Sequence, residues 1–211
     1  MKSPDEILSR LSSALGQREA TANILVAKSL ASKKDLEGIR VLVDGLKHKN
    51  KLIQHDCIKA LYEIGAIDPK LISGYFNVFL DLLKSKNNRL QWGGMTALQS
   101  ITLAIPDKTF KALPSILEAA GKGTVITRDG AIQLLIHLAS IKKYYAAVIH
   151  LLFEQLMTSP PNQTPMYAER ISPLINKSNA DDFIKIVQSR LKDMEKESQK
   201  ARLTRVVAMR Y

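Results

Sequence analysis

Apolar residues recur along most of the chain at spacings of three and four positions, as in Ile7, Leu8, Leu11 and Leu15. This spacing is typical of an amphipathic α-helix that buries one face. No segment shows the alternation of apolar and polar residues that a half-buried β-strand would have. The pattern predicts an all-α protein in which short turns connect antiparallel helices.

One arrangement of apolar and small residues occurs three times, beginning at Ile53, Leu90 and Ile126, with steps of 37 and then 36 residues. In each copy a small residue follows four positions after the aliphatic residue. A fixed period of this length is typical of helical units that stack on one another. A leucine follows eight positions after each aliphatic residue, and we expect these leucines to be buried at equivalent places: Leu61, Leu98 and Leu134.

The same pattern divides the chain into segments. Ser3-Pro4-Asp5-Glu6 predicts a helix start, and Gly16 predicts the end of that first helix. A second helix is expected over about residues 18–31. We expect a single solenoid made of an N-terminal cap pair (1–34), clear repeats (35–157), a degenerate C-terminal repeat or cap (158–200) and a basic tail (201–211).

The C-terminal part of the chain departs from the repeat. The proline-rich segment that begins at Ser159 predicts the longest loop. A shorter helix over about residues 166–175 should be interrupted near Pro173, because proline cannot continue a helix. One final helix is expected from Asn179 to about Arg202.

The first clear copy of the repeat resembles the second-helix signature of the HEAT-repeat family. That signature combines an aliphatic and a basic residue, a small residue, Ala-Leu and a closing Ile-Gly. Here Gln54, Gln91 and Thr127 replace the basic residue, so the Asp–Arg ladder of the family is not expected. The resemblance implies a right-handed superhelix of about five antiparallel helix pairs that serves as a binding scaffold. The copy reads Leu52-Ile53-Gln54-His55-Asp56-Cys57-Ile58-Lys59-Ala60-Leu61-Tyr62-Glu63-Ile64-Gly65.

The charge of the chain narrows the kind of partner. Its 211 residues include 31 Lys and Arg against 20 Asp and Glu, which gives a formal net charge of +11. Such an excess favours anionic partners: nucleic acid, an acidic protein surface or anionic lipid. The alternative is that the charge serves solubility alone.

Basic residues gather at the turn between the two helices of each repeat, and no Asp or Glu lies within these turns. Stacking places equivalent turns side by side, so we expect a basic edge that could follow a phosphate backbone or an acidic partner. Lysines at helix ends also complement the helix dipole without any partner. The residues of this expected basic edge are Lys47, Lys49, Lys51, Lys84, Lys86, Arg89, Lys122 and Arg128.

His55, Trp92 and Arg128 take the same position in successive repeats, two residues after the aliphatic residue that opens each copy. They are therefore expected to align in a row on the inner surface of the solenoid. A tryptophan beside basic residues can stack on a base or anchor a partner side chain, although such a residue more often packs between repeats. The neighbouring Gly93-Gly94 indicates close packing or an exposed groove.

The sequence contains no convincing catalytic or metal site. Cys57 is the only cysteine, and none of the four histidines has metal-ligand spacing with another. The segment Gly121-Lys122-Gly123-Thr124 is too short for a phosphate-binding loop and follows no strand. We therefore expect no catalytic residue, no metal and no cofactor.

One enzymatic alternative comes from a resemblance. A group of small DNA alkylation-repair glycosylases is similar in length and basic charge and is built from HEAT-like repeats. The resemblance implies aromatic residues and an acid on a DNA-facing surface, for which this chain offers Trp92, Asp56 and Asp129. A second aromatic residue in the same row is lacking.

These observations favour a non-enzymatic scaffold that binds a macromolecular partner through its concave face and its basic edge. A protein partner is expected first, and a nucleic-acid binder related to the repair glycosylases is the alternative. The sequence indicates no small-molecule substrate. No apolar stretch is long enough to span a bilayer, and no signal peptide is recognisable at the start, so a cytoplasmic location is expected.

Overall fold

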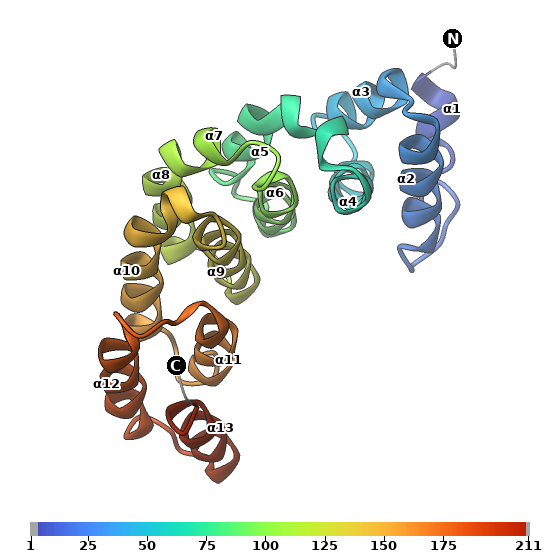
Figure 1. Cartoon of the computed structure of the whole chain (residues 1–211). Coiled ribbons are helices and arrows are strands. Elements are labelled where there is room, and N and C mark those ends of the chain that lie inside the picture. Colours follow the sequence, from blue (N-terminus) through green and yellow to red (C-terminus); the bar gives the residue numbers. More distant parts are fainter. Residues whose placement is uncertain (1–3, 210–211) are drawn as a thin grey trace. The chain divides into compact units, whose positions relative to one another are not determined.

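A computed structural model describes residues 4–209 of the chain, and no β-strand occurs among them. The chain divides into two compact units, residues 1–134 and residues 135–211, which are described separately below. Figure 1 shows that both units consist of helices joined by short connections. The predicted all-α fold of antiparallel helix pairs is confirmed.

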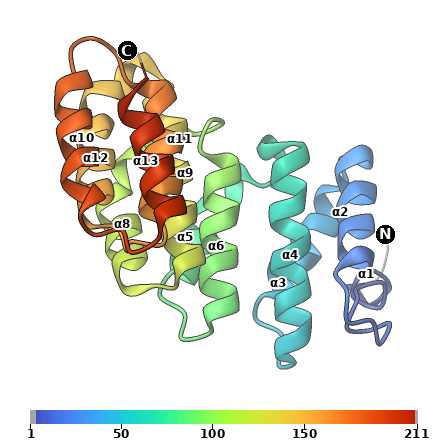
Figure 2. The same ribbon diagram turned by 90° about the horizontal axis from the view of Figure 1, so that it is seen from below.

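Unit 1 places its helices in two layers. Figure 1 shows α3, α5, α7 and α8 on one side and α2, α4 and α6 on the other, which we call the inner layer. Figure 2 shows the three inner helices side by side. The elements of unit 1 are α1 (Pro4–Leu8), α2 (Thr21–Lys33), α3 (Leu36–Gly45), α4 (Lys51–Ile67), η1 (Pro69–Leu71), η2 (Ser73–Tyr75), α5 (Phe76–Leu82), α6 (Asn88–Ile101), α7 (Pro106–Lys111), α8 (Leu113–Lys122) and the larger part of α9 (Val125–Ala139).

Short polar side chains cap the starts of α3, α4 and α6 in unit 1. The Asp35 carboxylate accepts a hydrogen bond from the Gly38 backbone N–H, 2.8 Å away, at the start of α3. At the start of α4, the Asn50 side chain accepts from the Leu52 N–H. Asn87 does the same for Arg89 at the start of α6. These caps satisfy N–H groups that have no partner inside the helix, and so they fix where each basic turn ends.

The core of unit 1 is formed by the repeated apolar positions. Leu61, Leu98 and Leu134 are each 0% exposed, as the sequence predicted. The small residue of each copy allows close approach of a neighbouring helix. A Cβ on Gly94 would lie 2.8 Å from Leu82 Cβ and 2.9 Å from the Phe79 carbonyl oxygen. The inner helices can therefore pack against the outer layer only where this position is small.

The first helix is shorter than the sequence predicted. It ends at Leu8 rather than at Gly16, and turns follow over residues 9–16. Two backbone N–H groups of this segment bond to side chains of later helices. The Ser12 N–H donates to Asn23 Oδ1 at 2.9 Å, and the Ser13 N–H donates to Asp56 Oδ2 at 2.7 Å. Tertiary contacts thus override the local helical pattern.

The outer helices of two repeats are also broken where the sequence predicted single helices. In the second repeat, two 3₁₀ turns precede α5. In the third repeat, α7 ends at Lys111 and α8 begins at Leu113, with Pro114 in its first turn. Pro114 has no N–H to bond the carbonyl of Phe110, four residues earlier, and its ring clashes with that carbonyl, which explains a break that the apolar pattern did not reveal.

Unit 2 contains the end of α9 and α10 (Lys142–Thr158), α11 (Thr164–Ile171), η3 (Ser172–Leu174), α12 (Ala180–Leu191) and α13 (Glu197–Val207). The short helix interrupted near Pro173 is confirmed, because α11 ends at Ile171 and Pro173 lies in η3. The expected single final helix is wrong. The buried Met194 lies in the connection between α12 and α13 and anchors the break.

The sequence predicted a basic tail from residue 201. Residues 201–207 instead belong to α13. Leu203 and Val206 are buried there. Arg202 donates from Nε and Nη2 to the two carboxylate oxygens of Glu169 on α11, and these bonds lower the pKa of Glu169 despite its partial burial. The apolar face and this ion pair hold α13 to the rest of unit 2.

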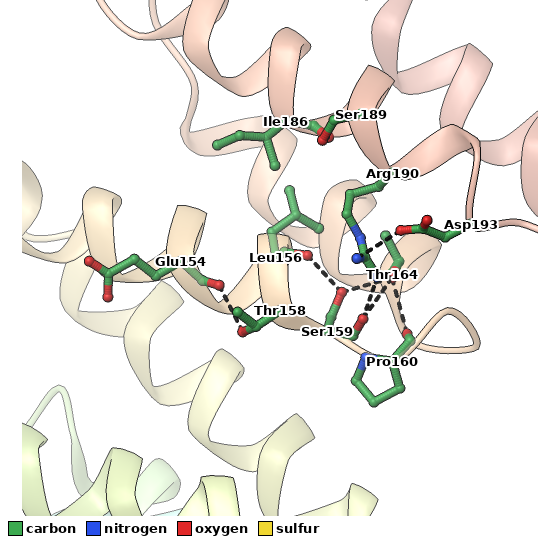
Figure 3. Close-up of polar contacts among 10 residues, drawn as sticks. All are labelled: Glu154, Leu156, Thr158, Ser159, Pro160, Thr164, Ile186, Ser189, Arg190 and Asp193. Carbon is green, nitrogen blue, oxygen red and sulfur yellow. Dashed lines mark hydrogen bonds and ion pairs between the residues drawn. The ribbon is translucent and has the colours of Figure 1, made fainter.

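Figure 3 shows how the proline-rich loop of unit 2 is held. Arg190 on α12 donates from Nη2 to the Ser159 carbonyl and to Thr164 Oγ1, and its Nη1 lies 2.8 Å from Asp193 Oδ2. The hydroxyls of Ser159 and Thr164 are 2.7 Å apart. The segment that the sequence predicted to be the longest loop is therefore an ordered connection, and the hydrogen bonds of one arginine hold it in place.

Candidate functional site

The first basic turn of unit 1 joins α3 to α4. Lys47 and Lys49 lie in the turn, Lys51 is the first residue of α4, and all three are exposed. Across residues 4–209, no ion pair joins any of these lysines to an acid. Their charges therefore face solvent without a counter-charge in contact.

In the second and third basic turns, some of the lysines form ion pairs with nearby acids. Lys84 is paired with Asp81 at 3.2 Å, and Lys122 is paired with Glu118 at 2.6 Å, both on the surface. The hydrogen bond from Lys122 lowers the pKa of the Glu118 carboxyl. Lys86 and Arg89 are exposed and make no ion pair within the described part of the chain. Exposed ion pairs of this kind are weak. They lower the net positive charge of the turn, but the lysines remain exposed to solvent.

Arg128 is used within unit 1. Its Nε donates to the Ala120 carbonyl at 3.3 Å, and its Nη2 donates to the Gly121 carbonyl at 3.2 Å. Both carbonyls belong to the last turn of α8, and the Ala120 carbonyl also accepts a hydrogen bond from the N–H of the C-cap residue Gly123. The guanidinium is thus a C-terminal cap and complements the dipole of α8.

His55 is half-buried on α4 and contacts the cap of the next inner helix. Its Nε2 lies 2.9 Å from Asn87 Nδ2, and Asn87 is the residue that begins α6. Burial lowers the pKa of His55, the Asn87 contact opposes this shift, and the nearby charge of Arg89 adds to it. Because its pKa is lowered, the His55 ring stays neutral down to a lower pH than an ordinary histidine, close to a permanent cation.

Trp92 lies against Tyr62 of the preceding inner helix, with 6.1 Å between ring centroids and a 48° tilt. Lys59 Nζ sits 4.8 Å from the Tyr62 ring centroid and also bonds to Glu63. Burial by itself lowers the pKa of Lys59, but the hydrogen bonds to Glu63 and Tyr62 raise it above its ordinary value. Both rings are only half-buried, so each keeps a face or edge toward solvent.

The segment at residues 12–20 and the helices α4 and α6 enclose a groove of about 360 Å³, which we call the N-terminal groove. Four basic or imidazole side chains line it: Arg18, His55, Lys59 and Arg89. Arg18 and Arg89 are exposed, and within residues 4–209 neither makes an ion pair.

Asp56 also lines the groove, but its two oxygens are already used. Oδ1 accepts from Asn23 Nδ2 at 2.7 Å, and Oδ2 accepts from the Ser13 N–H at 2.7 Å. Asp56 thus holds the wall of the N-terminal groove in place. A second hollow of about 390 Å³ lies between α5, α6 and α8 and includes Lys84 and Lys122 of the basic edge.

Metal and nucleophile chemistry has no support in the described residues. No group of three or more His, Cys, Asp and Glu side chains within residues 4–209 is placed to hold a metal ion. Burial raises the pKa of the Cys57 thiol to about 12, so the reactive thiolate is suppressed at neutral pH. Over the same residues, no helix combines the length and the apolar character needed to cross a membrane.

No protein-family profile matches the sequence, and no curated protein matches it either. Solved structures do resemble it. One engineered protein aligns with a TM-score of 0.60 at 18% identity, covering 98% of this chain and 96% of its own. A second engineered protein gives 0.58 at 18% identity, with 98% of each chain covered. A designed armadillo repeat protein gives 0.57 at 12% identity, covering 97% of this chain and 98% of its own.

The chain has the armadillo/HEAT-like helical-repeat fold. The resemblance of the sequence to HEAT repeats is confirmed at this level, and identities of 18% and below carry the likeness no further than the fold. The armadillo/HEAT-like repeats bring His55, Lys59, Tyr62, Arg89 and Trp92 together on adjacent inner helices. The basic edge is joined to this cluster only through Arg89.

Sequence reasoning missed three members of the surface of this armadillo/HEAT-like fold. Arg18 lies 37 residues before His55, at the equivalent position one repeat earlier, although it lies in the non-helical segment before α2 rather than on an inner helix. The repeat period was a sufficient signal for Arg18. Lys59 and Tyr62 occupy positions that hold Thr96 and Gln99 one repeat later, so the repeat gave no signal for them.

Proposed function

We propose that this chain is a non-enzymatic scaffold that binds a macromolecular partner, a protein, through the inner layer of unit 1 and the adjoining basic edge. The observation that carries the proposal is the Tyr62–Trp92 pair on two adjacent inner helices, with the Lys59 cation over the Tyr62 ring and the charge of Arg89 acting on Tyr62. Tryptophan, tyrosine and arginine are the residues that most often dominate the binding energy of protein interfaces.

The proposal also agrees with the charge of the chain. A net charge of +11 raises the rate of encounter with acidic partners, especially at low salt. The lysines of the first turn have no ion pair within residues 4–209, so they can pair with a partner without first breaking an internal contact. Half-buried aromatic rings add apolar area that binding can cover.

The nucleic-acid alternative is favoured by one specific observation. Tyr62 supplies beside Trp92 the second aromatic residue that the sequence seemed to lack. The resemblance also requires an acid that faces the DNA, and Asp56 does not supply a free one: one of its oxygens accepts from the Ser13 N–H and the other from Asn23 Nδ2 on α2. Arg128, which would extend a phosphate track to the third repeat, caps α8.

Affinity capture with the intact protein tests the proposed scaffold. Wild type is compared with a variant carrying Lys49→Glu, Lys86→Glu and Arg89→Glu, and bound proteins are quantified by mass spectrometry. A matched control reverses three exposed lysines elsewhere: Lys111→Glu, Lys177→Glu and Lys192→Glu. We expect the same protein partner with wild type and control, reduced at least about tenfold with the first variant. Equal recovery with all three proteins would exclude the basic edge from binding.

A salt titration tests the alternative. Fluorescein-labelled duplex and single-stranded DNA and RNA are titrated with the protein between about 50 and 200 mM salt. A backbone-binding protein would show a log–log slope of about −0.9 for each phosphate contact on duplex DNA. The scaffold proposal expects no binding above the nonspecific level. Tight binding lost with the three glutamate substitutions would instead support the nucleic-acid function.

A further inference from the structure

The N-terminal groove shares Arg89 with the basic edge and His55 with the row of repeated positions, and it adds the segment that precedes α2. One wall is the segment 12–20, which is not helical before Thr21, and the other is α4 with the start of α6. Arg18 comes from the first wall, and His55, Lys59 and Arg89 come from the second. Three cationic side chains and one imidazole therefore face the groove from elements that are far apart in the sequence.

The groove has an excess of positive charge. Its acids are Asp56, whose oxygens are both hydrogen-bonded, and Glu19. Lys59 is already paired with Glu63, while Arg18 and Arg89 make no ion pair within the described part of the chain. The two arginines are thus the groups available to an incoming anion, and an arginine can bind a carboxylate with two parallel hydrogen bonds.

The aromatic pair is linked to the groove through Lys59. Lys59 lines the groove and sits over the Tyr62 ring, while the charge of Arg89 acts on both His55 and Tyr62. Trp92 packs against Tyr62. A ligand that fills the groove would therefore meet half-exposed aromatic rings directly beside it.

We infer that the N-terminal groove receives an acidic segment of the protein partner, with one or two carboxylates between Arg18 and Arg89 and a neighbouring apolar side chain against Tyr62 and Trp92. A volume of about 360 Å³ suits a few side chains rather than a folded domain. The inference rests on the proposed scaffold function and names the chemistry that the inner layer recognises.

The chemistry of the walls favours a peptide over a nucleic acid. A polynucleotide presents regularly spaced phosphates and needs a continuous cationic track. Here Lys84, Lys122 and Arg128 are engaged with groups of unit 1, and Glu19, Asp56 and Glu63 interrupt the positive surface. A mixed segment with acidic and apolar side chains matches this surface better than a uniform polyanion.

Selection from a phage-displayed library of random dodecapeptides tests the inference with a defined probe. The full-length protein is the target, and phage are counter-selected on a variant with Arg18→Glu and Arg89→Glu. Selected peptides are synthesised with a fluorescein label, and their dissociation constants are measured by anisotropy. We expect Asp or Glu to be enriched next to an aromatic or aliphatic residue. Replacing those acids by their amides should weaken binding at least about tenfold.

Single substitutions then locate the site. Arg18→Ala, Arg89→Ala and Trp92→Ala should each weaken the selected peptide about tenfold, while Arg40→Ala on the exposed side of α3 should leave it unchanged. Arg89→Lys should retain more affinity than Arg89→Ala, because the positive charge is kept. Both arginines are exposed, so the fold should survive, and circular dichroism checks this.

Three results would overturn the inference: no peptide selected, selected peptides without acids, or affinities unaffected by Arg18 and Arg89. Displacement of the peptide by a single-stranded oligonucleotide at physiological salt would also overturn it in favour of nucleic acid. Loss of the peptide site leaves the scaffold proposal standing if capture of the partner from cells is still reduced by Lys49→Glu with Lys86→Glu alone, because neither lysine lines the groove. The two failures are therefore separable.

Discussion

Asn23 and Asp56 are 33 residues apart in the chain, and Asn23 Nδ2 donates a hydrogen bond to Asp56 Oδ1 at 2.7 Å. Asn23 is 1% exposed, and its own carbonyl oxygen accepts from the Ser12 N–H. The second Asp56 oxygen accepts from the Ser13 N–H. These bonds tie the N-terminal segment to two inner helices and so form one wall of the N-terminal groove.

Replacing Asp56 by Ala should destabilise unit 1. The change leaves the Asn23 amide and the Ser13 N–H without their acceptor, which costs about 1–3 kcal/mol when such groups are buried. Urea unfolding followed by circular dichroism measures the loss. Asp44→Ala, at an exposed carboxylate on α3, is the control and should change stability by less than about 0.5 kcal/mol. Equal effects of the two changes would contradict a structural role for Asp56.

Leu98→Ala should cost about 2–5 kcal/mol, because Leu98 is 0% exposed at the centre of the repeated core and its truncation leaves a cavity. Leu103 lies nearby in the chain but is 54% exposed. Leu103→Ala should therefore change the free energy of unfolding by less than about 0.5 kcal/mol. Denaturant titrations of the two variants give the comparison, and similar losses would argue against the stacking of repeats described above.

Two glycines should respond to alanine in opposite directions. Gly94→Ala should destabilise unit 1, because the new Cβ would meet Leu82 and the Phe79 backbone below 3 Å. The space around Gly121 on α8 is open, with nothing within 4 Å of a new Cβ. Gly121→Ala should therefore stabilise the helix by about 0.5–1 kcal/mol. Thermal unfolding resolves both signs, and a neutral Gly94→Ala would refute close packing between α5 and α6.

Cys57 should make stability fall at alkaline pH. Burial raises its pKa from 9.0 to about 12, so the folded state keeps the proton after the unfolded state has lost it. This contribution is complete below pH 9 and is lost as the pH rises from 9 toward 12, at about 1.4 kcal/mol per pH unit. The free energy of unfolding of wild type and of Cys57→Ala is measured at pH 8 and at pH 10. The difference between the two proteins isolates the contribution of the thiol, because Lys59 and Tyr62 are present in both. A parallel pH dependence of the two would contradict the burial of the thiol.

The repeated leucines show what the sequence could predict. Leu61, Leu98 and Leu134 recur because each helix pair must bury an apolar stripe against its neighbours, and this requirement leaves a period in the sequence. The breaks at Leu8 and at Lys111 leave no such period. They arise from single contacts, such as Ser13 with Asp56, or from one proline, and a pattern averaged over several turns does not register them.

The repeat period also predicted some features of the candidate site and not others. The period predicted the positions of His55, Trp92 and Arg128, but it did not predict that Arg128 would cap α8. Lys59 and Tyr62 join the surface because of the particular residues on α4 rather than because of the repeat. The repeat therefore predicts the position of each residue on its helix. The contacts of its side chain depend on neighbouring residues that differ from one repeat to the next.

Site-specific photo-crosslinking tests the central claim most directly, which is that a partner binds the inner layer of unit 1. Benzoylphenylalanine replaces Trp92 in one variant and the exposed Arg40 of α3, in the outer layer, in a matched variant. Both are irradiated in extracts of the cells that make the protein, and crosslinked products are identified by mass spectrometry. The account predicts one dominant protein product from position 92, reduced at least tenfold at position 40. Equal products from both positions, products only from position 40, or a nucleic-acid product from position 92 would contradict it.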